Sequence, residues 1–95
     1  MPTYVWLSTL TENGALTVCH NPKRIREVNA EVEKMGVKIL AQYALLGPYD
    51  FLTIVEATDN ETVARLSAII SSRGSIKIMT LGAIPAEDFI AGMKR

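Results

Sequence analysis

A Gly-Pro-Tyr-Asp segment, Gly47 to Asp50, contains residue types that could act on a ligand. The Tyr49 hydroxyl and the Asp50 carboxylate could orient a polar molecule at the mouth of a cavity. The same residues also suit a tight turn, because Gly allows an unusual φ, Pro fixes the chain, and Asp bonds neighbouring backbone amides. We favour the turn interpretation, because these are the ordinary residues of turns.

Cys19 and His20 form a second candidate pair, directly ahead of a helix start that Asn21-Pro22 predicts. A thiolate there would be favoured by the helix dipole and by backbone N–H groups. The chain has no other Cys or His, so carboxylates would have to supply the remaining ligands of a metal. We therefore favour a pair without function, and the leading prediction for the chain is no metal, no cofactor and no catalytic residue.

Glu56 belongs to a third group with Tyr4, Trp6 and Gln42. An apolar neighbourhood would raise the pKa of Glu56 and suit it to acid–base work. The alternative, which we favour, is that Glu56 ends a strand and faces solvent or pairs with Lys77, since charged residues are seldom buried unpaired. The candidate ligand-binding residues are therefore Tyr4, Trp6, Gln42, Tyr49, Asp50 and Glu56.

The composition predicts one domain over residues 1–95 with a mostly aliphatic core, because 48% of the residues are hydrophobic and few are aromatic. Ten basic and ten acidic residues cancel, which argues against nucleic acid and anionic membranes as partners. The first residues do not resemble a signal peptide, and no apolar run approaches the ~20 residues of a membrane span. With a single cysteine, the chain is expected in the cytoplasm.

Hydrophobic periodicity and turn residues divide the chain into alternating strands and helices. Residues 11–14 resemble a turn, residues 15–20 are either a loop or a helical lead-in, and Thr58 with Glu61 fits a capping box. Residues 86–95 are expected to form a short helix docked on the domain. The other predicted elements are strands at 3–10, 37–46, 51–57 and 75–84, and helices at 22–35 and 58–73.

This βαββαβ order predicts an α+β, ferredoxin-like fold, with strands one and three central in a four-stranded antiparallel sheet. Both helices should cover one face, which we assign to the more apolar parity. That face is predicted to contain Val5, Leu7, Val37, Ile39, Ala41, Phe51, Val55, Ile76 and Ile78. The opposite face is predicted to contain Tyr4, Trp6, Ser8, Leu40, Gln42, Leu52, Ile54, Glu56, Lys77, Met79 and Leu81.

Leu46 to Asp50, followed by Phe51 to Ala57, resembles the GYD-domain family of small, largely uncharacterised prokaryotic proteins. The signature residues are Gly47, Tyr49 and Asp50, with Pro48 between them. Supporting similarity is found in Met1-Pro2-Thr3-Tyr4, Ala41-Gln42-Tyr43, Glu56-Ala57 and Asp59. The resemblance covers essentially the whole chain and implies a ferredoxin-like fold related to dimeric α/β-barrel proteins, without an established reaction.

The second sheet face is too apolar for water, so the sequence predicts a homodimer or higher oligomer that stacks two sheets face to face. The leading functional hypothesis is a dimeric, non-catalytic module that binds a small organic ligand or a protein. The alternative is a cofactor-free enzyme, an isomerase or monooxygenase, with a site between the two sheets. Its acid–base candidates are Glu56, Tyr49, Asp50 and His20.

Overall fold

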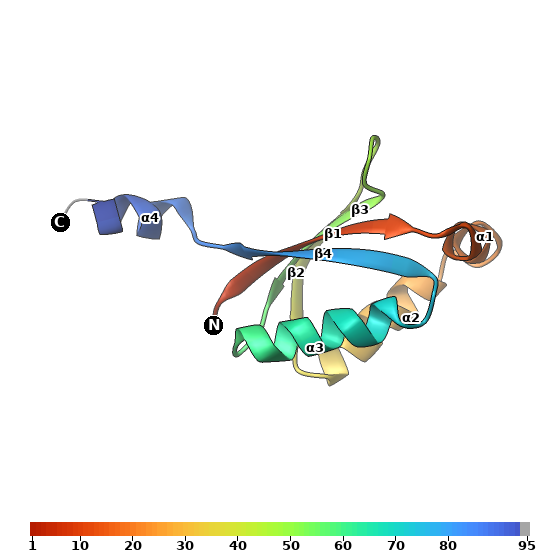
Figure 1. Cartoon of the computed structure of the whole chain (residues 1–95), viewed down its shortest axis with the longest axis horizontal. Coiled ribbons are helices and arrows are strands. Elements are labelled where there is room, and N and C mark those ends of the chain that lie inside the picture. Colours follow the sequence, from red (N-terminus) through yellow and green to blue (C-terminus); the bar gives the residue numbers. More distant parts are fainter. Residues whose placement is uncertain (94–95) are drawn as a thin grey trace.

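The computed structural model describes residues 1–93 and contains four strands and four helices in the order βααββαβα. Figure 1 shows two helices below the sheet and one helix extending away from it. The elements are β1 (Thr3–Leu10), α1 (Glu12–His20), α2 (Arg24–Lys34), β2 (Lys38–Ala44), β3 (Phe51–Glu56), α3 (Asn60–Ser71), β4 (Ile76–Ala83) and α4 (Ala86–Met93).

The strands form one antiparallel sheet in the order β2-β3-β1-β4, so the predicted central strands, β1 and β3, are confirmed. Helices α2 and α3 cover the same face of this sheet (Figure 1), with α2 packed on β2 and α3 on β4. This arrangement is the ferredoxin-like α+β fold that the element order predicts. The β2–β3 hairpin closes through the Leu45 amide, which donates to the Asp50 carbonyl at 2.8 Å.

Helix α1 replaces the turn that was predicted at residues 11–14. Thr11 is its N-cap, and its hydroxyl accepts a hydrogen bond from the Gly14 amide at 3.1 Å. Gly14 is buried against β4: a Cβ at this position would lie 1.8 Å from the Ser75 carbonyl oxygen. Asn13-Gly14 therefore marks a close approach of helix to strand, which has the same sequence signature as a turn.

Two helix starts also differ from prediction. Asn21 is the C-cap of α1 instead of the N-cap of α2, which begins two residues after Pro22 at Arg24. Helix α3 is capped by Asp59, whose carboxylate accepts from the Thr62 amide at 2.8 Å, so the predicted Thr58 cap is wrong by one residue. Asp accepts this bond at least as well as Thr, which explains the shift.

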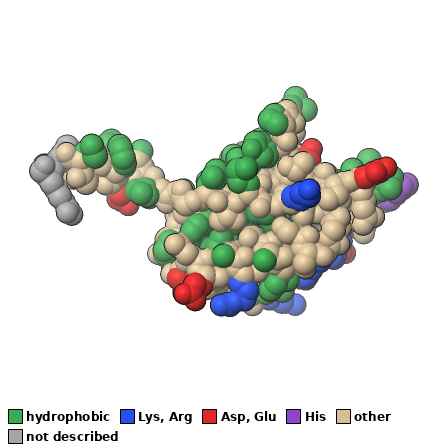
Figure 2. Space-filling view, viewed as in Figure 1, with side chains coloured by type: hydrophobic (Ala, Val, Ile, Leu, Met, Phe, Trp, Pro, Cys, Tyr) green, Lys and Arg blue, Asp and Glu red, His purple; other side chains and the backbone are tan. Residues whose placement is uncertain are grey.

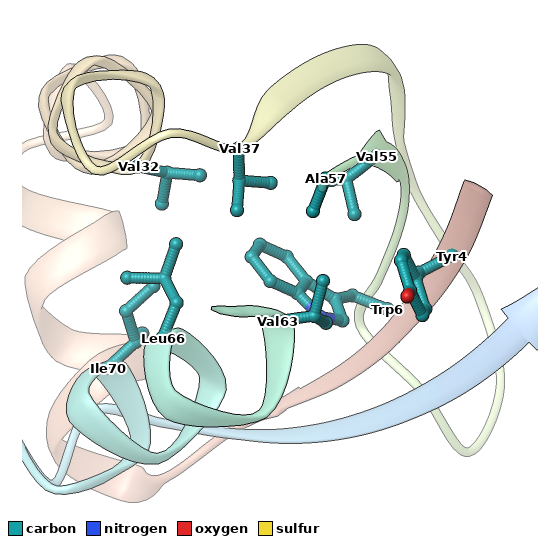
Figure 3. Close-up of a cluster of buried hydrophobic side chains, with 9 residues drawn as sticks. All are labelled: Tyr4, Trp6, Val32, Val37, Val55, Ala57, Val63, Leu66 and Ile70. Carbon is teal, nitrogen blue, oxygen red and sulfur yellow. The ribbon is translucent and has the colours of Figure 1, made fainter. Parts of the chain in front are cut away.

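The core lies between the sheet and helices α2 and α3, with the Trp6 indole at its centre (Figure 3). Tyr4, Trp6 and Ser8 of β1 are all buried on this helix-covered face. The prediction placed these three residues on the opposite face and Val5 and Leu7 in the core, so the parity of β1 is wrong. The remaining buried hydrophobic residues are Val32, Val37, Val55, Ala57, Val63, Leu66 and Ile70.

A register shift in β2 changes the face of two further predicted residues. Ile39 pairs with Val55, whereas Ala41 pairs with Ile54, which leaves Leu40 as the extra residue of a bulge. Beyond the bulge, Gln42 lies on the helix-covered face and Ala41 on the open face, contrary to prediction. Residues of β3 and β4 lie on the predicted faces: Phe51, Val55, Ile76 and Ile78 under the helices, and Leu52, Ile54, Glu56, Lys77, Met79 and Leu81 opposite.

Helix α4 forms where a C-terminal helix is predicted, but it is not docked on the sheet or helices. Every residue of α4 is exposed, and Figure 1 shows the helix extending beyond the end of β4. The last two positions of the predicted segment, 94–95, lie outside the described residues. The chain therefore presents Phe89, Ile90 and Met93 as an apolar arm.

Candidate functional site

A cavity of about 330 Å³ lies between the helix-covered face of the sheet and helices α1, α2 and α3. Its size falls at the lower end of the range for small-molecule sites. Apolar side chains form most of the wall, and none of the Asp or Glu residues within 1–93 lines it. The apolar lining includes Trp6, Leu10, Val18, Ile25, Val28, Val32, Ile39, Phe51, Ile70, Ile76 and Ile78.

Polar side chains from four elements meet on the wall of this cavity. Gln42 of β2 donates to the Thr53 hydroxyl at 3.1 Å and accepts from the Asn29 amide of α2 at 2.8 Å. Ser8 and Thr53 are the buried polar residues of the sheet, and both line the cavity. The hydrogen-bonded amides hold α2 against the hairpin, and they place oxygen and nitrogen atoms beside an apolar volume.

Trp6 lines the cavity, but its indole nitrogen is buried within the protein beside it. Its side chain is 4% exposed, and within residues 1–93 the buried indole Nε1 has no hydrogen-bond partner. An unpaired buried N–H carries a desolvation cost of about 1–3 kcal/mol. Because this nitrogen has almost no surface accessible to water, it does not open onto the cavity.

Two arginines, Arg24 of α2 and Arg73 after α3, line the cavity and share one carboxylate. Glu31 accepts two bonds from the Arg73 guanidinium, at 3.0 and 2.7 Å, and lies 3.7 Å from Arg24. The hydrogen bonds from Arg73 lower the pKa of Glu31, and Glu31 in turn raises the pKa of Arg73. The pair joins α2 to the end of α3.

The Gly-Pro-Tyr-Asp segment has a structural role at the end of β1. Gly47 adopts φ +119°, in the region that favours glycine. The Asp50 carboxylate accepts from the Leu10 amide at 2.8 Å, and the Asp50 amide donates to the Ser8 carbonyl at 2.8 Å. Asp50 thus extends the β1–β3 ladder by a side-chain bond to an amide of another strand, whereas the turn interpretation expected it to bond neighbouring amides of the turn.

The face of the sheet opposite the helices carries the open-face patch, a continuous group of apolar side chains. Register places its members side by side, with Leu7 between Leu52 and Met79. The hydroxyl of Tyr49 lies on the same face, 3.9 Å from the Met79 sulfur. Figure 2 shows hydrophobic side chains on the side of the molecule away from α2 and α3 and along α4. The open-face patch consists of Val5, Leu7, Leu52, Ile54, Met79 and Leu81.

The six predicted ligand-binding residues do not meet in one place. Trp6 and Gln42 line the cavity, and the Tyr4 hydroxyl, outside that lining, donates to Asn60 at the start of α3. Tyr49 and Glu56 lie on the other side of the sheet, and Asp50 is bound to the end of β1. The ligand-binding role of each residue stays a prediction, but a common site between two sheets would exclude Tyr4, Trp6 and Gln42.

The acid–base candidates are also dispersed. Asp50 directly precedes β3 and Glu56 is its last residue, so about 20 Å of extended chain separates them. His20 is exposed at the end of α1. Cys19 is exposed beside it. In residues 1–93, no three His, Cys, Asp or Glu side chains come close enough to hold a metal ion.

Sequence reasoning missed the cavity and both of its arginines. Arg24 and Arg73 are 49 positions apart and each resembles an ordinary surface charge, so only the packing of α2 beside α3 brings them together. A usable signal was present in Ser8, Thr53 and Gln42, which are polar residues at strand positions that alternate with apolar ones.

The fold and the two apolar surfaces define a small α+β protein with an antiparallel sheet that is covered on one side. Two solved structures share this architecture. FFRP-DM1 matches with a TM-score of 0.59 at 22% identity, covering 88% of this chain and all of that one. TTHA0845 from Thermus thermophilus matches with a TM-score of 0.56 at 21% identity, covering 90% of this chain and 95% of that one.

The GYD domain model matches residues 4–92, so the chain belongs to the GYD domain family. A relative from Thermus thermophilus is 58% identical over 95 residues, covering 99% of this chain and all of the relative. That relative is named glutamine synthetase and cystathionine beta-lyase binding protein. In the part of the chain that is described, no helix has the length and apolar character needed to cross a membrane.

Proposed function

We propose that this chain is a protein-binding module whose partners are the enzymes glutamine synthetase and cystathionine β-lyase. The observation that carries the proposal is the name of the relative, which is 58% identical along the full length of both chains. Two exposed apolar surfaces support it, because such surfaces commonly mark sites of protein contact. A cytoplasmic location, which a single exposed cysteine favours, fits this role.

The α4 arm is the segment that we assign to the partner enzymes. Phe89, Ile90 and Met93 share one side of this helix, and Glu87 and Asp88 give it a polar first turn. A short amphipathic helix that projects from a folded body can lie in a groove of another protein, with apolar anchors that supply most of the affinity. Phe89 is 59% exposed and is the largest such anchor in the arm.

The open-face patch is the surface that we assign to self-association. Two copies stacked through it would cover side chains that otherwise face water, in the manner of two packed sheets. Val5, Leu7, Leu52 and Ile54 are half-buried by their neighbours, whereas Met79 and Leu81 are exposed. The dimer would leave the cavity and its helix layer outside the contact, because they lie on the other side of the sheet.

Separate variants test the two assignments in one experiment. Phe89→Glu should abolish binding of the purified chain to each immobilised enzyme and leave its sedimentation mass unchanged. Leu81→Glu should reduce the mass to that of one 10.4 kDa chain, because a charge within the contact would be buried without a partner. Leu16→Glu, which alters an exposed leucine on α1, is the control for both measurements.

Failure of the parent chain to bind either enzyme at micromolar concentration would reject the proposed partners. Full enzyme binding by Phe89→Glu would reject the assignment to α4 while leaving the partners in place. A parent chain that sediments as a monomer, or a Leu81→Glu chain that keeps the mass of the parent, would reject the open-face dimer.

A further inference from the structure

We propose that the cavity under the helices binds a small monocarboxylate with an apolar body. This inference goes beyond the proposed protein-binding role and does not depend on it. The cavity volume of about 330 Å³ equals about eleven water molecules of liquid, at ~30 Å³ each. A molecule of the size of 3-phenylpropionate fits within such a volume.

The wall supplies the apolar contacts. Ile25 and Val28 line the cavity from α2, and Phe51 and Ile78 line it from the opposite sheet. These side chains are all partly buried, so a ligand between the two layers would remove their remaining apolar surface from water. The body of the ligand is therefore expected to be aliphatic or aromatic.

The polar atoms of the wall favour a hydrogen-bond acceptor. The Thr53 hydroxyl, which accepts from Gln42, keeps its own proton to donate. Ser8 adds a second buried hydroxyl. Because the guanidinium groups of Arg24 and Arg73 are obligate donors and the two hydroxyls can also donate, the wall recognises oxygen acceptors and disfavours ammonium groups.

The two arginines of the wall favour an acceptor that is negatively charged. Arg24 and Arg73 line the cavity, and the described part of the chain places no acidic side chain on its wall. Each guanidinium has five N–H donors, of which the observed bonds to Glu27 and Glu31 use one in Arg24 and two in Arg73. The separation of 3.7 Å between Arg24 and Glu31 is too long for a strong hydrogen bond. Arg24 is therefore the arginine best placed to bind a second carboxylate.

Trp6 is the only tryptophan of the chain, so one indole N–H resonance reports directly on the cavity. The experiment titrates the ¹⁵N-labelled protein with 3-phenylpropionate, with the uncharged 3-phenylpropanamide, and with acetate. We expect the carboxylate to shift the indole resonance saturably with a Kd below about 1 mM, the amide to bind at least about tenfold more weakly, and acetate to have no effect.

Arg24→Gln should remove the preference for the carboxylate over the amide without loss of folding, because Arg24 is at the surface end of the wall. Arg26→Gln is the matched control, since Arg26 is exposed on the same helix and does not line the cavity. Leu81→Glu should leave the titration unchanged, which separates the cavity from the open-face patch. No saturable indole shift, equal binding of acid and amide by the parent, or equal effects of Arg24→Gln and Arg26→Gln would each overturn the proposal.

Discussion

The two faces of the sheet differ in a way that reverses the usual expectation. The face under the helices contains two buried hydroxyls, Ser8 and Thr53, and the Gln42 amide beside a cavity. The face without helices carries the open-face patch, in which six apolar side chains from three strands lie together. The side that the chain itself covers is therefore the more polar one in β1, where Tyr4, Trp6 and Ser8 lie inside.

Apolar content alone therefore does not identify the face of a sheet that packs in the core. Val5 and Leu7 alternate with Tyr4 and Trp6 along β1, and both sets would be stable when buried. A second apolar face has a physical reason only if another molecule covers it, since water disfavours a continuous apolar surface. The pattern of β1 thus fits the core on one face and the proposed dimer contact on the other.

The first prediction concerns Gly14 on the helix-covered side of the sheet, where we expect the largest loss of stability. Gly14→Ala would place a methyl group 1.8 Å from the Ser75 carbonyl oxygen, so α1 must move away from β4. We expect a loss of about 3 kcal/mol or more in the free energy of unfolding, because overpacking against backbone has no flexible neighbour to absorb it. Denaturant unfolding of the variant measures this loss.

Gly92→Ala is the control, because a Cβ there meets no atom of residues 1–93 within 4 Å. It lies within α4, where alanine should be neutral or should favour the helix by up to about 1 kcal/mol. A Gly14→Ala chain as stable as the parent would contradict the close approach of α1 to β4.

The second prediction compares neighbours on one strand that face opposite sides. Val55 is fully buried under the helices, and Ile54 is half-buried in the open-face patch. Val55→Ala should cost about 2 kcal/mol at every protein concentration. At low protein concentration, Ile54→Ala should cost less stability than Val55→Ala. The cost of Ile54→Ala should rise with protein concentration, because association stabilises the parent by mass action.

Thermal melts over a hundredfold range of protein concentration measure both variants. A cost for Ile54→Ala that is independent of concentration would mean that nothing covers the open face in solution. The costs of the two variants would then differ only because Val55 is more deeply buried within one chain than Ile54.

The third prediction concerns the GYD signature, which joins the two faces at one end of the sheet. Asp50→Ala should cost about 1 kcal/mol, because the Leu10 amide loses its only acceptor described in the structure. Tyr49→Phe should change stability by less than about 0.5 kcal/mol, since its hydroxyl meets only the Met79 sulfur at 3.9 Å. Urea unfolding of the two variants measures both costs. Equal costs would contradict the assignment of a structural hydrogen bond to Asp50 and none to the Tyr49 hydroxyl.

The sequence predicted the topology because strands and helices differ in hydrophobic period, and that signal survives errors at element ends. The bounds of β1, Thr3 to Leu10, were predicted without error, and the β2–β3 hairpin was located by Gly47-Pro48. Helix α1 was missed because Asn13-Gly14 has turn chemistry, while its true constraint is contact with Ser75, far along the chain. Local sequence carries no record of such a contact.

The candidate site was harder to predict than the fold. The bulge at Leu40 reverses the face of Gln42, and no residue type there announces an extra position. Arg24 and Arg73 meet only because α2 and α3 pack side by side. Site prediction failed where it depended on register and on helix packing, which are tertiary properties.

The smallest expected effect lies at the ion pair that joins the two helices over the cavity. The hydrogen bonds from Arg73 hold the pKa of Glu31 below its ordinary value of 4.5. A carboxyl group whose pKa is lower in the folded state contributes stability above its unfolded pKa, and this contribution is lost as pH falls through the folded value. The parent should therefore lose stability as the pH drops below about 4.5, and Glu31→Gln should lose less over the same range.

Glu31→Gln should remove only part of the acid dependence, because hydrogen bonds from Thr62 lower the pKa of Asp59 in the same direction. Glu87→Gln, on the exposed arm, is the control and should follow the parent at every pH. Chemical unfolding between about pH 3 and pH 7 tests this sign, and a parent and a Glu31→Gln chain with parallel curves would show that the ion pair over the cavity contributes nothing to folding.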